Sequence, residues 1–188
     1  MIRKAPLILL LLSSPALATV EVANVAFGDH VTVAGQQLTL NGAGLRTRFI
    51  FNVYTIGLYL PVKTSSAAVA LAEPGAKRIR FVMQHTVTAG ELVDAFDAAL
   101  RANNSEAALQ AIGGRLDRFK KLLTGQGGAR KGSEYLLDYV PGVGTHLTID
   151  GVVQDAPIPG ADLFEALMRA WLGPRPVQEN LKEALLGK

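Results

Sequence analysis

The 188-residue sequence predicts an α+β fold, in which a large antiparallel β-sheet is covered by a layer of α-helices. Runs rich in β-branched and aromatic residues come in hairpin-like groups that are separated by Gly, Pro, Asn and Asp. Segments with helical periodicity gather in the middle and at the end of the chain. Strands grouped in this way pair with their sequence neighbours, and the helices then pack as a layer on the sheet.

The first 18 residues predict a secretory signal peptide. Arg3 and Lys4 precede a short apolar run, and a small-x-small motif ends at Ala18. We therefore expect cleavage after Ala18, export to the periplasm, and one domain over residues 19–188. The alternative is an uncleaved anchor, but the apolar run is shorter than the ~20 residues that span a bilayer.

Composition excludes several classes of function. Without Arg3 and Lys4, 17 basic residues face 16 acidic ones, so the pI gives no argument for a nucleic-acid partner. The chain has no cysteine, which excludes disulfides, thiolate catalysis and cysteine-based zinc sites. About 170 residues, rich in apolar side chains, are enough for one hydrophobic core. We expect no transmembrane segment in the mature chain, and the sequence leaves the oligomeric state open.

The first half of the mature chain predicts mainly strands. We expect strands over residues 20–27 and 30–33, and a longer one from Gln37 that breaks at Asn41-Gly42. The stretch from Leu40 to Pro61 predicts one long apolar strand, with its strongest β signal over 49–59. A short helix over 65–71 and a strand over 77–83 follow.

The second half predicts helices and a meander. Thr88 and Glu91 have the spacing of a capping box, and apolar residues recur at helical intervals behind them. A second amphipathic helix covers 105–123, and a glycine-rich loop follows it. The other predicted elements are strands over 134–140, 145–150 and 152–154, and helices over 161–172 and 177–186.

Common catalytic and cofactor motifs are absent from the sequence. His30, His85 and His146 do not have metal-ligand spacing, so we predict no metal site. Gly42-Ala43-Gly44 lacks the third glycine of a dinucleotide fingerprint, and a strand follows where a helix should begin. We predict no cofactor.

One β-like stretch carries polar residues that need an explanation. If residues 46–58 form a single regular strand, then Arg46, Asn52 and Tyr54 share one face, while Thr55 lies on the other. A buried guanidinium is very unfavourable without a partner, because it loses its hydration and keeps its charge. Three explanations stay open: an internal Asp or Glu from a neighbouring strand, a guanidinium that reaches water near the strand end, or a carboxylate or phenolate ligand held by Arg46 and the Tyr54 hydroxyl.

Four segments together resemble the chalcone isomerase-like superfamily, in particular its bacterial exported branch. They are GAGLRTRFIFNVYTIGLYLP, HTVTAGELVDAFDAAL, YVPGVGTHLTIDG and WLGPRPVQENLKEALLG. The resemblance implies an open-faced β-sandwich, in which a large antiparallel sheet packs against helices with a ligand cleft between them. It also implies two functional classes, which are intramolecular lyases that close chalcones to flavanones and non-catalytic proteins that bind fatty acids.

The resemblance places Arg46 at the arginine that both classes share. It places Tyr54 where the fatty-acid binders have tyrosine and the enzymes have a catalytic threonine, with Thr55 adjacent. The enzymes' tyrosine and asparagine correspond to Ala89 and Phe96, so two polar catalytic groups are missing.

We therefore expect an exported, non-catalytic binder of a fatty acid or similar amphipathic carboxylate in an apolar cleft. The candidate ligand-binding residues are Arg46, Asn52, Tyr54 and Thr55. Two alternatives stay open, which are an intramolecular lyase that acts on an enone and an envelope interaction module without a ligand. An internal Asp or Glu beside Arg46 would favour the module.

Overall fold

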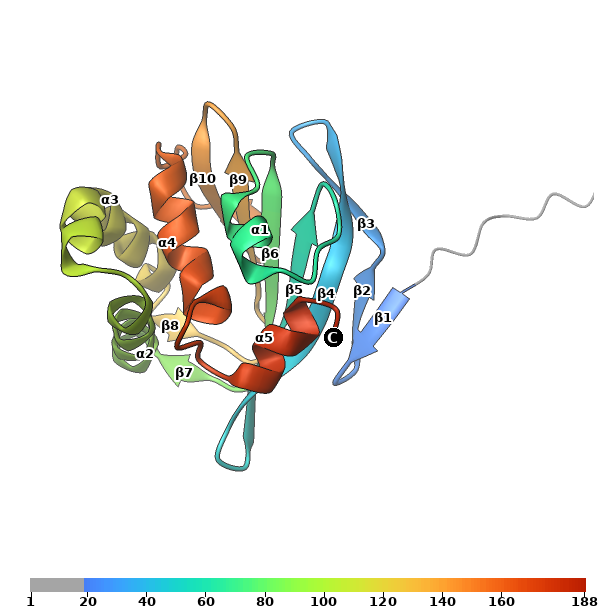
Figure 1. Ribbon diagram of the computed structural model, residues 1–188. Helices are drawn as coiled ribbons and strands as arrows, with labels where there is room; N and C mark the ends of the chain where they lie inside the picture. The colour runs from blue at the N-terminus through green and yellow to red at the C-terminus, as the bar shows by residue number, and fades with distance from the viewer. Residues whose placement is uncertain (1–18) are drawn as a thin grey trace, which may run out of the picture.

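A computed structural model describes residues 19–188; the predicted signal peptide lies outside this range. Its centre is a seven-stranded antiparallel sheet with the strand order β11-β10-β9-β6-β5-β4-β3 (Figure 1). The strands are β3 (His30–Val33), β4 (Gln36–Arg48), β5 (Phe51–Leu60), β6 (Lys77–Met83), β9 (Glu134–Val140), β10 (Gly144–Ile149) and β11 (Val152–Val153). Two small two-stranded sheets accompany it, made of β1 (Thr19–Val22) with β2 (Val25–Gly28) and of β7 (Val87–Thr88) with β8 (Gly128–Ala129).

Helices cover one face of the sheet, as the sequence predicts (Figure 1). They are α1 (Ala67–Ala72), α2 (Ala89–Asn103), α3 (Glu106–Thr124), α4 (Ala161–Leu172) and α5 (Glu179–Leu185). The main core lies between them and the sheet, where α4 is buried along most of its length. A smaller core on the other face forms around Phe27, from β2, and Tyr59. Among residues 19–188, no helix is long and apolar enough to cross a membrane.

The predicted caps explain where the middle helices begin. The Thr88 hydroxyl accepts a hydrogen bond from the Glu91 N–H at 3.3 Å, and the Glu91 carboxylate accepts one from the Thr88 N–H at 2.8 Å. This reciprocal pair is the predicted capping box, which satisfies two free N–H groups of the first turn of α2. Ser105 caps α3 in a simpler way, by accepting from the Ala108 N–H at 3.2 Å.

Two strand predictions were wrong at their turns. The predicted strand 20–27 is a tight hairpin, whose turn residues Ala23 and Asn24 both have positive φ. The stretch from Leu40 to Pro61 is likewise not one strand but the antiparallel hairpin of β4 and β5. Its turn is Phe49-Ile50, which lacks the Gly, Asn or Asp that usually marks such a turn.

The predicted break at Asn41-Gly42 is not a turn either. β4 runs through it with only a register shift between Leu40 and Gly42. The buried Asn41 amide donates to the Leu185 carbonyl at 2.6 Å, and its oxygen accepts from the Thr64 N–H at 2.7 Å. A Cβ on Gly42 would overlap the Ala184 carbonyl oxygen. The pair is therefore the place where the end of α5 docks on β4.

Candidate functional site

Arg46 and Tyr54 lie directly opposite each other on the neighbouring strands β4 and β5. Directly opposed residues of an antiparallel pair project from the same face of the sheet. Here that face is the one under the helices, because Tyr54 packs against the main core with Ile56 and Leu58 two and four residues further along β5. The hairpin thus brings together the two residues that the sequence placed on one strand.

The Tyr54 side chain sits in an aromatic cluster between sheet and helix. Its hydroxyl accepts a hydrogen bond from the Trp171 indole N–H at 2.9 Å. The Phe81 ring packs edge-on against Tyr54, with centroids 5.5 Å apart, and lies 5.2 Å from the Trp171 ring. These contacts join β5, β6 and α4 at one point.

Burial raises the pKa of Tyr54 above its ordinary value of 10.0. The Trp171 N–H and the nearby Arg46 guanidinium oppose this effect, because both stabilise a phenolate, but burial prevails. Tyr54 is therefore a neutral hydroxyl near neutral pH. Since the oxygen already accepts from Trp171, its own O–H can serve as a donor to another group.

Arg46 is half-buried and has only neutral partners among the described residues. Its Nη1 donates to the Gln178 side-chain oxygen at 3.0 Å and to the Thr47 carbonyl. No Asp or Glu oxygen between residues 19 and 188 lies within 4.0 Å of it. The internal carboxylate that would favour an interaction module is thus not found beside Arg46 in the described chain.

The Nε and Nη2 atoms of Arg46 are the part of its guanidinium that could bind a carboxylate. Within the described chain, all its hydrogen bonds start from Nη1. Arg78 on β6 shows what the other edge can do, because its Nε and Nη2 each donate to one Asp138 oxygen at 2.6 Å. This two-point arrangement is the strong form of carboxylate recognition by arginine. Arg46 has no such carboxylate partner in the described chain, but its guanidinium lies close enough to the Tyr54 oxygen to lower the pKa of Tyr54 against the larger, raising effect of burial.

Gln178 holds the site at the start of α5. Its side-chain oxygen accepts from Arg46 and from the Thr47 N–H at 2.9 Å, while its Nε2 donates to the Leu45 carbonyl at 3.3 Å. These bonds tie the N-terminus of α5 to β4, and they fix the position of the Arg46 guanidinium.

The apolar region next to the site is nearly closed. A cavity of about 10 Å³ lies between β5, β6 and the helices α4 and α5. Its walls are Ile56, Leu58, Ile79, Met168, Trp171, Leu172 and Leu185. This volume is about that of one water molecule, so the predicted apolar cleft is not open in this conformation. Trp171 is both a wall of the cavity and the partner of Tyr54.

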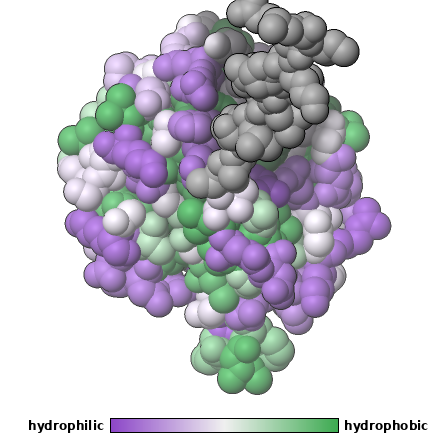
Figure 2. Space-filling view, turned by 90° about the vertical axis from the view of Figure 1, so that its right-hand side faces the viewer, coloured by the Kyte–Doolittle hydropathy of each residue, from purple (hydrophilic) through white to green (hydrophobic). Residues whose placement is uncertain are grey.

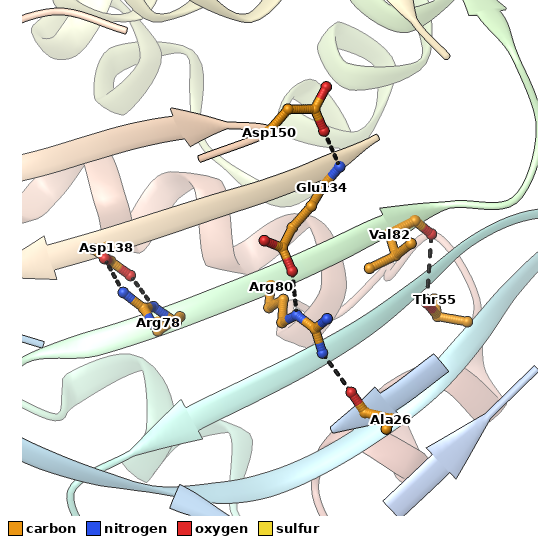
Figure 3. A network of polar contacts seen from close by, with 8 residues as sticks. All are labelled: Ala26, Thr55, Arg78, Arg80, Val82, Glu134, Asp138 and Asp150. Atoms are coloured by element: carbon orange, nitrogen blue, oxygen red, sulfur yellow. Dashed lines mark hydrogen bonds and ion pairs between the residues drawn. The ribbon is translucent and has the colours of Figure 1, made fainter. Parts of the chain in front are cut away.

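The other two predicted ligand-binding residues do not join Arg46 and Tyr54. Thr55 is fully buried and pairs with Leu45 and Val82, so it projects from the opposite face of the sheet. Its hydroxyl points to the Val82 carbonyl at 3.4 Å, on the face that carries the ion pair of Arg78 with Asp138 (Figure 3). Asn52 is exposed near the hairpin turn, where it pairs with Thr47.

Sequence reasoning missed Trp171 and Gln178 as members of the site. Trp171 lies 117 positions beyond Tyr54, and its spacing in α4 indicates only a core residue. Gln178 follows a Pro-containing segment with no periodic pattern. Both fall inside the segment WLGPRPVQENLKEALLG, which resembles the superfamily and was the one available signal.

Comparisons with known proteins agree with this architecture. A fatty-acid binding protein from Arabidopsis thaliana has a similar structure, with a TM-score of 0.68 at 16% sequence identity, and the match covers 90% of this chain and 96% of that one. The likeness confirms the predicted fold. A search of curated proteins gives no match. A family model described as chalcone isomerase-like matches residues 19–187, and the chain therefore belongs to the chalcone isomerase-like family.

Proposed function

We propose that this protein is an exported, non-catalytic binder of a fatty acid or a similar amphipathic carboxylate. The observation that carries the proposal is the half-buried Arg46 guanidinium, which has no carboxylate partner in the described chain and lies beside the Tyr54 hydroxyl at the border of an apolar core. The name of the Arabidopsis protein, a fatty-acid binding protein of similar fold, supports it.

The head group of the ligand would be held by two side chains from neighbouring strands. The carboxylate would accept two bonds from Arg46 and a third from the Tyr54 O–H. Bonds to charged groups contribute roughly 1.5–3 kcal/mol each when they are shielded from water. Trp171 would keep the Tyr54 oxygen in place.

The acyl chain would extend along the helix-facing side of β5. Past Tyr54 this side presents Ile56 and Leu58, which line the small cavity under α4 and α5. Each buried methylene would add about 0.8 kcal/mol. Because the cavity is so small, α4 or α5 must move away from the sheet when a chain enters.

Two residues of α2 support binding without catalysis. Phe96 packs on Phe119 of α3, with ring centroids 5.6 Å apart, and Ala89 has no polar side chain. These are the positions that the resemblance aligns with the enzymes' tyrosine and asparagine. An enolate that developed during cyclisation would therefore lack two of its polar partners.

The test is a calorimetric titration of delipidated protein with a fatty acid and with the fatty alcohol of the same length. Arg46→Ala should weaken the acid by at least about tenfold and the alcohol little, because only the acid carries a charge. Arg46→Lys should fall between wild type and alanine, since it keeps the charge and loses the fork.

Arg48→Ala is the matched control, because it removes the same charge two residues away on the same strand, at an exposed position. It should leave both affinities unchanged. Circular dichroism must show every variant folded. If folded Arg46→Ala binds the acid as tightly as wild type does, Arg46 is a structural residue and the proposal fails.

A further inference from the structure

The turn of the β4–β5 hairpin is the most exposed apolar feature of the described chain. Phe49 is 91% exposed, Ile50 88% and Phe51 52%. The neighbouring strand β6 ends at Met83, opposite Tyr54, so the hairpin continues beyond it as a ribbon of two strands. Figure 1 shows this ribbon below the body of the molecule, and Figure 2 shows its end as a hydrophobic knob. Its apolar side chains have almost no cover.

The backbone of this turn does not suit the residues that form it. Phe49 has a φ of 54°, in the left-handed region that bulky side chains rarely adopt. Two-residue turns of this kind usually have Gly, Asn or Asp there. The chain instead carries an aromatic and a β-branched residue that bury nothing. A local conflict of this kind, without a structural gain, indicates a functional position.

Basic residues lie around the apolar tip, which we define as residues 49–51. The exposed Arg48 guanidinium is 5.9 Å from the centre of the Phe49 ring, and His85 packs on Phe51 with ring centroids 5.2 Å apart. The loop with Arg130 and Lys131 reaches the same end of the molecule, because the Lys131 N–H donates to the Thr86 hydroxyl at 3.1 Å.

Two carboxylates lie near this end as well. The Glu91 carboxylate is held by the Thr88 N–H and hydroxyl, both at 2.8 Å. Glu179 follows Gln178, the partner of Arg46. Neither belongs to residues 49–51. Hydrogen bonds from Thr88 lower the pKa of Glu91 most, and the nearby His85 and Arg48 lower it further. Among the described residues, Arg48 is the cation that packs on the tip, over the Phe49 ring.

We propose that the apolar tip inserts into the headgroup region of a lipid bilayer that contains anionic phospholipids. Aromatic and aliphatic side chains flanked by arginine are typical of segments that sit at a membrane interface. Exposed basic residues then add attraction to anionic headgroups. The same pair of strands carries the site of the proposed function, on which this inference rests for the origin of the ligand.

The apolar tip lies close to Arg46 along β4, so its insertion would bring the proposed ligand site near the bilayer. Arg46 precedes Phe49 by three residues, which is about 10 Å along a strand. A tip buried in the headgroups would place the Arg46 and Tyr54 side chains just above them. A fatty acid that leaves the bilayer could then reach the guanidinium over a short path, without crossing bulk water.

The test is co-sedimentation of delipidated protein with vesicles of phosphatidylcholine alone and of phosphatidylcholine mixed with phosphatidylglycerol. The wild type should bind the mixed vesicles more tightly. The double variant Phe49→Gly with Ile50→Ser suits the turn and removes its apolar side chains. It should bind at least about tenfold more weakly, while its thermal midpoint stays equal or rises.

Val152→Ser with Val153→Ser is the matched control. These two valines are 62% and 61% exposed on β11, at the edge of the sheet farthest from β3, so the variant removes exposed apolar surface elsewhere. It should bind vesicles as the wild type does. Arg48→Ala should weaken binding to the mixed vesicles and change binding to pure phosphatidylcholine little.

The inference is overturned if the wild type does not bind vesicles, or if the tip variant and the wild type bind equally. Sedimentation velocity tests whether the tip instead binds a second copy of the chain. Self-association that the tip variant abolishes, with no binding to vesicles, would support a dimer contact and overturn the inference. The titration with soluble fatty acid separates the two proposals. Vesicle binding lost in the tip variant, without any fatty-acid binding by the wild type, would support the inference and refute the proposed function.

Discussion

Burial, the hydrogen bond from Trp171 and the nearby Arg46 together set the pKa of the Tyr54 hydroxyl. Because burial raises its pKa, the folded protein keeps this proton above the ordinary pKa of 10.0, while the unfolded chain releases it. The free energy of unfolding therefore falls as the pH rises above about 10. We predict that Tyr54→Phe shows a smaller loss of stability between about pH 9 and about pH 11 than the wild type does.

Urea unfolding at several pH values measures this difference. Tyr59 and Tyr135 also have raised pKa values through burial, but they contribute equally to both proteins and cancel in the comparison. The variant should be less stable even at neutral pH, because the Trp171 N–H loses its acceptor. An identical dependence on pH in both proteins would mean that Tyr54 is not buried enough to hold its proton.

The two positions that the resemblance aligns with the enzymes' polar groups also predict a catalytic result. With Ala89 and Phe96 at the two aligned positions, we expect chalcone to cyclise no faster than the spontaneous reaction when the protein is added. The decay of chalcone absorbance and the chirality of the flavanone measure this. A rate well above the uncatalysed one, with a single enantiomer formed, would show an intramolecular lyase instead.

The sequence pointed to Arg46 and Tyr54 for a reason that survives the wrong secondary structure. Their side chains would share a face either on one strand, where they are eight residues apart, or across a hairpin, where they are paired. Thr55 shows the limit of this reasoning. It is adjacent to Tyr54 in the sequence, but its side chain projects from the opposite face of the sheet. Trp171 and Gln178 come from distant helices, and only tertiary packing brings them to the site.

At the scale of elements, helix predictions were more accurate than turn predictions. The capping box and the apolar periodicity fix where α2 and α3 begin, because both signals are local. The pairs Asn41-Gly42 and Phe49-Ile50 misled in opposite ways. The first has turn residues but serves to dock α5, and the second forms a turn without them. The contact that explains the first lies 144 residues away in the sequence, which a local pattern cannot show.

Gly42 gives a direct test of how α5 docks on β4. Gly42→Ala would drive its Cβ into the carbonyl of Ala184, and the Leu185 carbonyl carbon would be 2.9 Å away. Since both are backbone atoms, the end of α5 must shift. We expect a loss of about 1–3 kcal/mol in the free energy of unfolding. Chemical denaturation measures it.

Gly114→Ala is the control, because a Cβ at Gly114 meets nothing within 4 Å. It should be neutral, or stabilise by up to about 1 kcal/mol, since alanine is the better helix former. If Gly42→Ala is as stable as this control, α5 is not held against β4 in solution.

At the scale of the whole molecule, export is a prediction that rests on residues outside the described range. The basic head, the apolar run and the motif that ends at Ala18 predict a mature chain that begins at Thr19. Thr19 is also where β1 begins, so cleavage there would leave the hairpin with β2 complete. Intact mass of protein recovered from the periplasm measures this. A chain that retains residues 1–18 would contradict the prediction.

The closed core under α4 and α5 predicts how a ligand enters the whole molecule. A cavity of about 10 Å³ cannot take an acyl chain, so the proposed ligand could bind only after the helices part from the sheet. The observed binding rate should then level off at high fatty-acid concentration, because opening becomes rate-limiting. Trp171 is the only tryptophan and borders both the cavity and Tyr54, so its fluorescence can follow binding.

A substitution at Gly44, which lies under α5, should change the rate of this opening step. A Cβ on Gly44 would lie 2.7 Å from Leu181 Cδ1 and 3.0 Å from Ala184 Cβ. Gly44→Ala should therefore loosen α5 and raise the plateau rate, because the closed state is the one that it destabilises. Gly113→Ala, whose Cβ would meet nothing within 4 Å, should leave the plateau unchanged. Stopped-flow fluorescence measures both. A rate that grows linearly with ligand concentration in all three proteins would mean that the chain enters without an opening step, by a route other than the core beneath α4 and α5.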